Sequence, residues 1–134
     1  MADVMKFELV SPEKKIASID ATMVQIPGGE GDFTAMANHT PTVSTLRPGI
    51  VRVVASNGDI SEFVVSSGFA EISEAGTSIL AERAVPKSEA TAEFLDSALA
   101  NAQSRLDAVD AQAANRAELE LALNDVKFLR SQLS

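Results

Sequence analysis

The residues with the most evident potential for chemistry are His39, the single histidine of the chain, and its neighbours Asp32 and Ser44. In one arrangement these three residue types catalyse acyl transfer, with the imidazole as the base that activates the serine. The sequence has no G-x-S-x-G turn, however, and His39 lies in a polar loop between Asn38 and Pro41, where a lone histidine is usually structural. We therefore expect no catalytic residue.

A glycine-rich segment, Gly28-Gly29-Glu30-Gly31, follows an apolar run, which is where a phosphate-binding loop would stand. Such a loop leads into a helix N-terminus and carries a lysine, whereas Asp32-Phe33-Thr34 continues with the alternation of a strand. Glu30 and Asp32 would also repel a phosphate. The segment is predicted to be a turn between strands.

The bulk composition excludes most other chemistry. The chain has 134 residues, no Cys, one His and a net charge of −8. The lack of Cys removes disulfides, thiolate metal sites and cysteine nucleophiles, and a single His removes the two-His metal motifs. The negative charge opposes binding to nucleic acid, which depends on Lys and Arg. We expect no metal, no cofactor and no nucleic-acid partner.

The C-terminal third carries charged side chains at helical spacing. Its close acidic residues, which we interpret as solvated helix faces, are Asp107, Asp110, Glu118 and Glu120. Arg116, Lys127 and Arg130 are separated by nearly whole helical turns and share a stripe. This stripe is either a solvated flank or a contact with an acidic partner surface.

Glycine and proline divide the chain into two parts, because all seven Gly and all five Pro lie within residues 1–86. Between them stand short apolar or alternating runs, which predict strands over residues 6–10, 16–26, 32–36, 43–47, 50–56, 59–66, 69–73 and 77–85. Asn57-Gly58 predicts a hairpin with a type I′ turn. Since no helical crossover interrupts the strands, residues 1–86 are predicted to form an antiparallel β-sandwich.

Residues 87–134 lack both breakers and are predicted to form an antiparallel α-helical hairpin. Ser88 is the expected N-cap of the first helix. Apolar residues then recur at helical spacing from Phe94 to Val109 and again from Leu119 to Leu133, with the turn expected over residues 110–115. The predicted fold class is therefore a β-sandwich followed by a helical hairpin.

The chain shows no sign of a membrane-targeting or membrane-spanning segment. Met1 to Val10 alternates charged and apolar residues and has no apolar core of a signal peptide. No apolar run reaches the ~18 residues that a membrane helix needs. We expect no direct insertion into a membrane.

Five segments, in order and in register, carry a resemblance to a known family. They are Pro27 to Phe33, His39 with Pro41, Leu46-Arg47-Pro48-Gly49, Ser67 to Ile72, and Ile79 to Ala84. Together they resemble the epsilon subunit of bacterial F-type ATP synthase, whose mitochondrial counterpart is called delta. The resemblance covers the sandwich half, and the tail agrees in type and length.

The resemblance implies a non-catalytic subunit of the rotor's central stalk. In that family the sandwich, here residues 1–86, binds the gamma subunit and the ring of c subunits and helps couple proton flow to ATP synthesis. It implies that Gly28, Gly29, Glu30, Gly31 and Asp32 lie at the c-ring end, and that Asn38, His39 and Pro41 lie near the gamma and ring contacts. It also implies a peripheral position on the cytoplasmic face of the bacterial inner membrane.

Two regulatory features of the family are expected to be weak in this chain. Some members bind ATP through a pattern that here reads Leu95, Asp96, Leu99 and Ala100, with Leu99 in place of an arginine that would contact phosphate. In other members a basic second helix contacts the beta subunit and inhibits ATP hydrolysis. The basic residues available here for that contact are Arg116, Lys127 and Arg130, offset by nearby acids. We predict weak or absent ATP binding and inhibition.

The alternative from another functional class is a β-sandwich that binds a ligand or acts as an adaptor, with a regulatory helical tail. An enzymatic role is a weaker interpretation, because the chain offers one His and no Cys.

Overall fold

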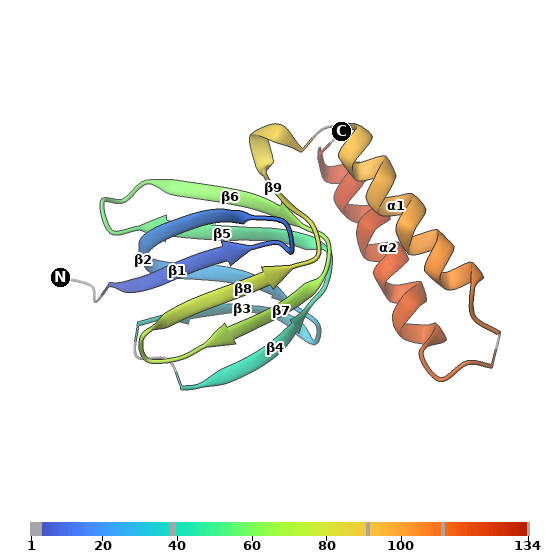
Figure 1. The fold of residues 1–134 in the computed structure, drawn as a ribbon, viewed down its shortest axis with the longest axis horizontal. Helices are drawn as coiled ribbons and strands as arrows, with labels where there is room; N and C mark the ends of the chain where they lie inside the picture. The colour runs from blue at the N-terminus through green and yellow to red at the C-terminus, as the bar shows by residue number, and fades with distance from the viewer. Residues whose placement is uncertain (1–3, 38–39, 91, 111, 134) are drawn as a thin grey trace. The chain divides into compact units, whose positions relative to one another are not determined.

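The computed structural model describes residues 4–37, 40–90, 92–110 and 112–133 (Figure 1). The chain divides into two compact units, Met1–Lys87 and Ser88–Ser134. The elements in order are β1 (Met5–Val10), β2 (Lys15–Gly28), β3 (Gly31–Met36), β4 (Thr42–Leu46), β5 (Gly49–Ala55), β6 (Ile60–Val65), β7 (Gly68–Ile72), β8 (Gly76–Ala81), β9 (Ala84–Pro86), a 3₁₀ turn (Lys87–Glu89), α1 (Ala92–Asp107) and α2 (Arg116–Leu133).

The first unit is a β-sandwich whose two layers share the long strand β2. In the first layer, residues 15–21 of β2 pair with β1, β1 pairs with β8, β8 with β7, and β7 with β4. In the second layer, the rest of β2 pairs with β3 on one side and β5 on the other, β5 pairs with β6, and β6 with β9. Every pairing is antiparallel except that of β1 with β8. The predicted fold class, an antiparallel β-sandwich followed by two helices, is confirmed.

The core lies between the two layers because alternate residues of each strand point inward. Phe7 on β1 and Phe63 on β6 stack across the layers, with ring centroids 6.4 Å apart. Aliphatic side chains fill the space around them, among them Leu9, Val24, Ile26, Val51, Val53, Val65, Ile72 and Ile79. Burial of this apolar surface is the main force that holds the sandwich together.

The hairpins differ in detail from the predicted turns. Strand β2 continues through Pro27 to Gly28, which pairs with Gly31, so the turn of the β2–β3 hairpin is only Gly29-Glu30. In the β5–β6 hairpin the amide of Gly58 donates to the carbonyl of Ala55, and Gly58 then adopts a φ of 92°. The type I′ prediction is therefore wrong: the loop has three residues, and its positive φ falls on the glycine after the turn.

The single strand expected over residues 77–85 is two strands, β8 and β9. Ala81 pairs with Gly68 of β7, whereas Ala84 pairs with Val65 of β6 in the other layer. The chain crosses between the layers at residues 82–83, and the neighbouring residues 66–67 cross in the same place. The buried positions Thr77, Ile79 and Ala81 are followed by Ala84, so the alternation shifts by one residue at the crossing, but no Gly or Pro marks it.

The first helix begins later than Ser88. Strand β9 pairs with β6 as far as Pro86, and the ammonium of Lys87 lies 3.7 Å from the carboxylate of Glu62 on β6. The chain then makes one 3₁₀ turn, Lys87–Glu89, before α1 starts at Ala92. The predicted N-cap at Ser88 is therefore wrong.

The second unit is a hairpin in which α1 packs against α2 (Figure 1). The buried side chains of the seam are Leu95, Ala98, Leu106, Leu123, Val126 and Leu129. Within the described residues, neither helix combines the length and apolar character needed to cross a membrane.

Candidate docking surfaces

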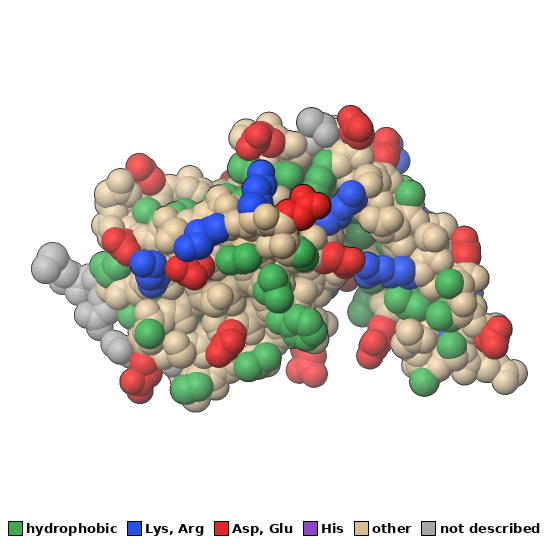
Figure 2. Space-filling model, in the orientation of Figure 1, with side chains coloured by type: hydrophobic (Ala, Val, Ile, Leu, Met, Phe, Trp, Pro, Cys, Tyr) green, Lys and Arg blue, Asp and Glu red, His purple; other side chains and the backbone are tan. Residues whose placement is uncertain are grey.

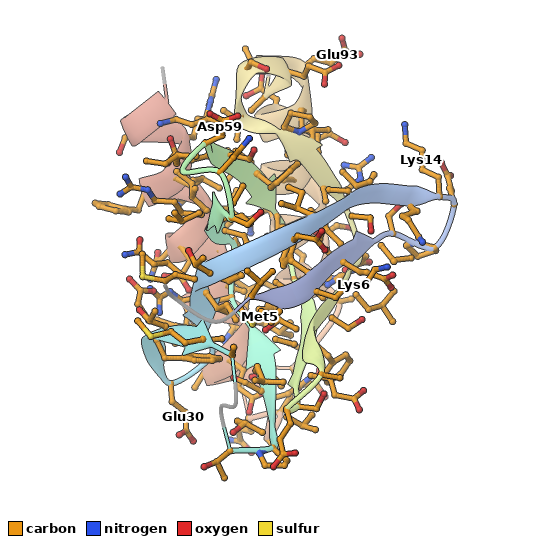
Figure 3. All side chains as sticks on the ribbon, turned by 90° about the vertical axis from the view of Figure 1, so that its left-hand side faces the viewer. Met5, Lys6, Lys14, Glu30, Asp59 and Glu93 are labelled. Atoms are coloured by element: carbon orange, nitrogen blue, oxygen red, sulfur yellow. The ribbon has the colours of Figure 1, made fainter. Side chains whose placement is uncertain are left out.

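The β2–β3 loop, residues 28–32, presents one acidic side chain at its tip. Glu30 is exposed and points away from the sandwich, as Figure 3 shows. Beside it, Asp32 forms an ion pair with Arg47, which follows β4. The loop is therefore a strand-connecting turn, as predicted, and Glu30 is its unpaired carboxylate among the side chains that the structure describes.

The outer face of the first layer carries exposed apolar side chains where alternation would place polar ones. Val43 on β4, Phe69 on β7 and Leu80 on β8 are 73%, 56% and 50% exposed. Phe69 pairs directly with Leu80, and the half-buried Val10 of β1 pairs with Leu80 on its other side. Hydrophobic side chains are visible over β7 and β8 in Figure 2. We call Val10, Val43, Phe69 and Leu80 the apolar face.

The apolar face has a polar border at one end. Lys6, Glu8 and Glu71 line a shallow hollow of about 310 Å³ near the turn at residues 73–76. An apolar centre with a charged border is the usual composition of a protein–protein interface. A nucleotide or small substrate would instead be expected to bury most of its surface in a deep pocket.

The hairpin brings together two residues that were expected at different sites. The guanidinium of Arg130 on α2 lies 2.7 Å from the carboxylate of Asp96 on α1. Leu99 is half-buried at the same end of the hairpin, where it shares a hollow of about 330 Å³ with Lys127, Arg130 and Ser131. Leu95 is buried in the seam and Ala100 is exposed.

Arg116 lies at the opposite end of α2, about 21 Å along the helix axis from Arg130 at 1.5 Å per residue. Its guanidinium is 3.1 Å from the carboxylate of Glu120 and also donates to the carbonyl oxygen of Val109. The three basic residues therefore do not form one patch: two are in ion pairs at opposite ends, and Lys127 is exposed.

The remaining candidates for chemistry gain no support. Asn38 and His39 lie outside the described residues, and Pro41 is exposed just before β4. Of the other two members of the Ser-His-Asp set, Asp32 is paired with Arg47 and the hydroxyl of Ser44 donates to the carbonyl of Thr45. In the described ranges, no three His, Asp or Glu side chains gather closely enough to hold a metal ion.

The sequence does not predict the apolar face or the contacts of Arg47. Val43, Phe69 and Leu80 stand within predicted strands, and alternation alone does not indicate which face of a strand is buried. The contacts of Arg47 with a loop 15 to 19 residues away in sequence have no local signal.

Comparisons with known proteins agree with this architecture. The family described as "ATP synthase, Delta/Epsilon chain, beta-sandwich domain" matches residues 4–87. An ATP synthase epsilon chain of Fuscovulum blasticum is 46% identical over 98% of this chain and 97% of its own length. One of Ruegeria sp. (strain TM1040) is 53% identical over 77% of this chain and 74% of its own length.

A solved structure resembles the whole chain. A chain in the structure of the Euglena gracilis mitochondrial ATP synthase, described as OSCP, F1 and c-ring, matches with a TM-score of 0.70 and 29% identity, covering 98% of this chain and 82% of that one. The match of the family to most of the chain, and of these relatives to its length, shows that the chain belongs to the delta/epsilon chain family of ATP synthase.

Proposed function

We propose that the chain is a non-catalytic rotor subunit of a proton-transporting ATP synthase, in which it links the gamma subunit to the c-ring and helps couple proton translocation to ATP synthesis. The observation that carries this proposal is the likeness to epsilon chains over nearly the whole length of the chain. The proposed location is peripheral, on the cytoplasmic face of the bacterial inner membrane, as part of the assembled enzyme.

Within this role, the sandwich, residues 1–86, is the docking module and the apolar face is its contact with gamma. The exposed area of Val43, Phe69 and Leu80 gives a reason for a partner to bind there, because covering apolar surface is the main driving force of protein association. A scattered exposed hydrophobic residue needs no such explanation, whereas paired neighbours on adjacent strands do.

The loop at residues 28–32 is the proposed contact with the c-ring. Its support is an exposed Glu30 on a short turn. Asn38, His39 and Pro41 are proposed to lie near the gamma and c-ring contacts on the strength of the family resemblance alone.

The experiment that tests this function is co-purification from membranes. A tagged full-length chain, expressed in its source organism and purified from detergent-solubilised membranes, is expected to bring down gamma and the c subunits together. The alternative, a ligand-binding or adaptor sandwich, would bring down neither. A chain that lacks both partners in this assay would refute the proposal.

The hairpin is proposed to bind ATP weakly or not at all. Leu99 offers no hydrogen bond to a phosphate, and the carboxylate of Asp96 is already in contact with Arg130. Calorimetric titration of the isolated chain with ATP is expected to show no saturable binding below the millimolar range. A clear submillimolar isotherm would contradict this.

Inhibition of ATP hydrolysis by the hairpin is also proposed to be weak, because contacts within the hairpin already occupy two of its basic side chains. Two of the basic residues available to contact an acidic surface of the beta subunit, Arg116 and Arg130, are paired within the hairpin. Truncation after Ser88 is therefore expected to leave the ATPase activity of the assembled enzyme nearly unchanged. An increase of several-fold on truncation would show that the hairpin does inhibit.

A further inference from the structure

The β2–β3 loop is fixed along one side by the end of β4. The amide of Gly29 donates to the carbonyl of Thr45 at 2.8 Å, and the amide of Arg47 donates to the carbonyl of Pro27 at 3.0 Å. Gly28 also pairs with Leu46 between these two bonds. The backbone on either side of the turn is thereby attached to residues 45–47.

Arg47 adds a second set of contacts through its side chain. One guanidinium nitrogen donates to the carbonyl of Gly28 at 3.0 Å, and another binds the carboxylate of Asp32. Gly28 and Asp32 are the first and last residues of the loop. The planar guanidinium therefore contacts both strands beside the Gly29-Glu30 turn through two separate nitrogens, a fork that lysine, with its single nitrogen, does not have.

We propose that Arg47 is a positioning residue that holds loop 28–32 in its docking conformation before a partner binds. The inference rests on the proposed function, in which this loop contacts the c-ring. A loop ordered in advance loses less conformational freedom on association, so its binding is tighter for the same contacts.

The contact with Asp32 also defines the charge that the loop presents. The guanidinium balances the Asp32 carboxylate, and Glu30 remains as the charge at the tip. Without Arg47 the loop would carry two adjacent carboxylates on a more mobile turn. Arg47 thus sets both the shape and the charge of the docking element.

The first test measures the free chain. Arg47→Gln and Arg47→Lys are compared with wild type by amide hydrogen exchange over residues 28–33, read by mass spectrometry. Arg47→Gln is expected to speed exchange of the Gly29 amide by about threefold to tenfold. This is the change in exchange rate expected when a local structure loses the stabilisation of one hydrogen bond. Arg47→Lys keeps the positive charge but lacks the two-nitrogen fork, so its exchange rate should fall between those of wild type and Arg47→Gln.

The second test measures docking. The same full-length variants, with Asp32→Asn, the double variant and Glu30→Ala, are titrated onto a gamma–c-ring assembly that lacks this chain. Arg47→Gln and Asp32→Asn are expected to weaken binding, and their effects should not add, because both act through the same contact. Urea unfolding of each variant shows that the fold is retained.

The outcomes separate the inference from the function on which it rests. If Arg47→Gln leaves exchange unchanged, the positioning role is refuted, even if Glu30→Ala weakens docking. If exchange rises but neither Arg47→Gln nor Glu30→Ala affects docking, the proposed use of the loop is refuted. Additive effects of Arg47→Gln and Asp32→Asn would show that the two residues act on docking independently, which also overturns the inference.

Discussion

The substitution Phe69→Ala tests the apolar face most directly, because Phe69 lies at its centre and contributes little to the folded core. Phe69 is 56% exposed and pairs with Leu80 on β8 and Thr45 on β4. We expect the variant to fold normally and to bind gamma much more weakly than wild type does.

The expected magnitude follows from the exposed area of the side chain. An aromatic side chain buries about 150–250 Å², so the exposed part of Phe69 is roughly 110 Å². At about 25 cal/mol per Å², covering that area contributes about 2.8 kcal/mol. Alanine retains part of the contact, so we expect a loss of about 2 kcal/mol, or about 30-fold in Kd.

The effect on the fold should be smaller. The interaction that Phe69 makes in the free chain is a cross-strand pair with Leu80, and such pairs contribute about 0.2–1 kcal/mol. The free energy of unfolding, from urea titration followed by circular dichroism, should therefore fall by less than half of the loss in binding.

The assay is calorimetric titration of the full-length chain into purified gamma. Ile60→Ala is the matched control, since Ile60 is similarly exposed, at 52%, but lies on β6 in the other layer of the sandwich. It removes a comparable apolar side chain from outside the apolar face and should leave the Kd unchanged. A Phe69→Ala variant that binds gamma within twofold of wild type, or an equal loss in Ile60→Ala, would refute the assignment.

Three further predictions concern stability. Gly68→Ala should lower the free energy of unfolding of the sandwich by about 2–4 kcal/mol, measured by urea titration. The φ of Gly68 is 152°, and an added Cβ would lie 1.9 Å from the carbonyl oxygen of Leu80. An unchanged urea midpoint would contradict this prediction. Leu123→Ala should cost about 2–5 kcal/mol within the hairpin and remove its helical signal at 222 nm at a lower temperature than wild type, since Leu123 is buried in the seam. A double-mutant cycle of Asp96→Asn and Arg130→Gln should give a coupling free energy of about 0.2–1 kcal/mol. This coupling should fall with added salt, because the ion pair is half-exposed. A coupling that persists in high salt would show that the pair is more than a surface contact.

The strands and helices were predictable because each has a local cause. Alternation in Lys6 to Val10 and the helical spacing from Phe94 onward follow from which side chains must be buried. Turn positions were also visible in Gly and Pro. The crossing at residues 82–83 was not visible in this way, because a strand that changes its partners needs no Gly or Pro. Its one local signal is the adjacent polar pair Glu82-Arg83, at which the alternation shifts by one residue.

The proposed docking surfaces were harder to predict because their signal is not local. An apolar residue in a strand is read as inward-facing, and only its register against buried neighbours places Phe69 or Val43 on the outside. The bridge from Arg47 to Asp32 joins two loops that the fold brings together. Neither the spacing nor the type of these residues indicates that contact.

The energetics of the hairpin identify what any opening of the two helices would have to overcome. The ion pair of Asp96 with Arg130 is half-exposed, so it contributes no more than about 1 kcal/mol. A single buried leucine of the seam, such as Leu95 or Leu123, contributes about 1.5–3 kcal/mol. The apolar seam, rather than the charges, therefore decides whether the helices stay paired. Opening the hairpin would expose the side chains of the seam to water, so an extended form would be favoured most by a partner that offers an apolar groove to the same side chains.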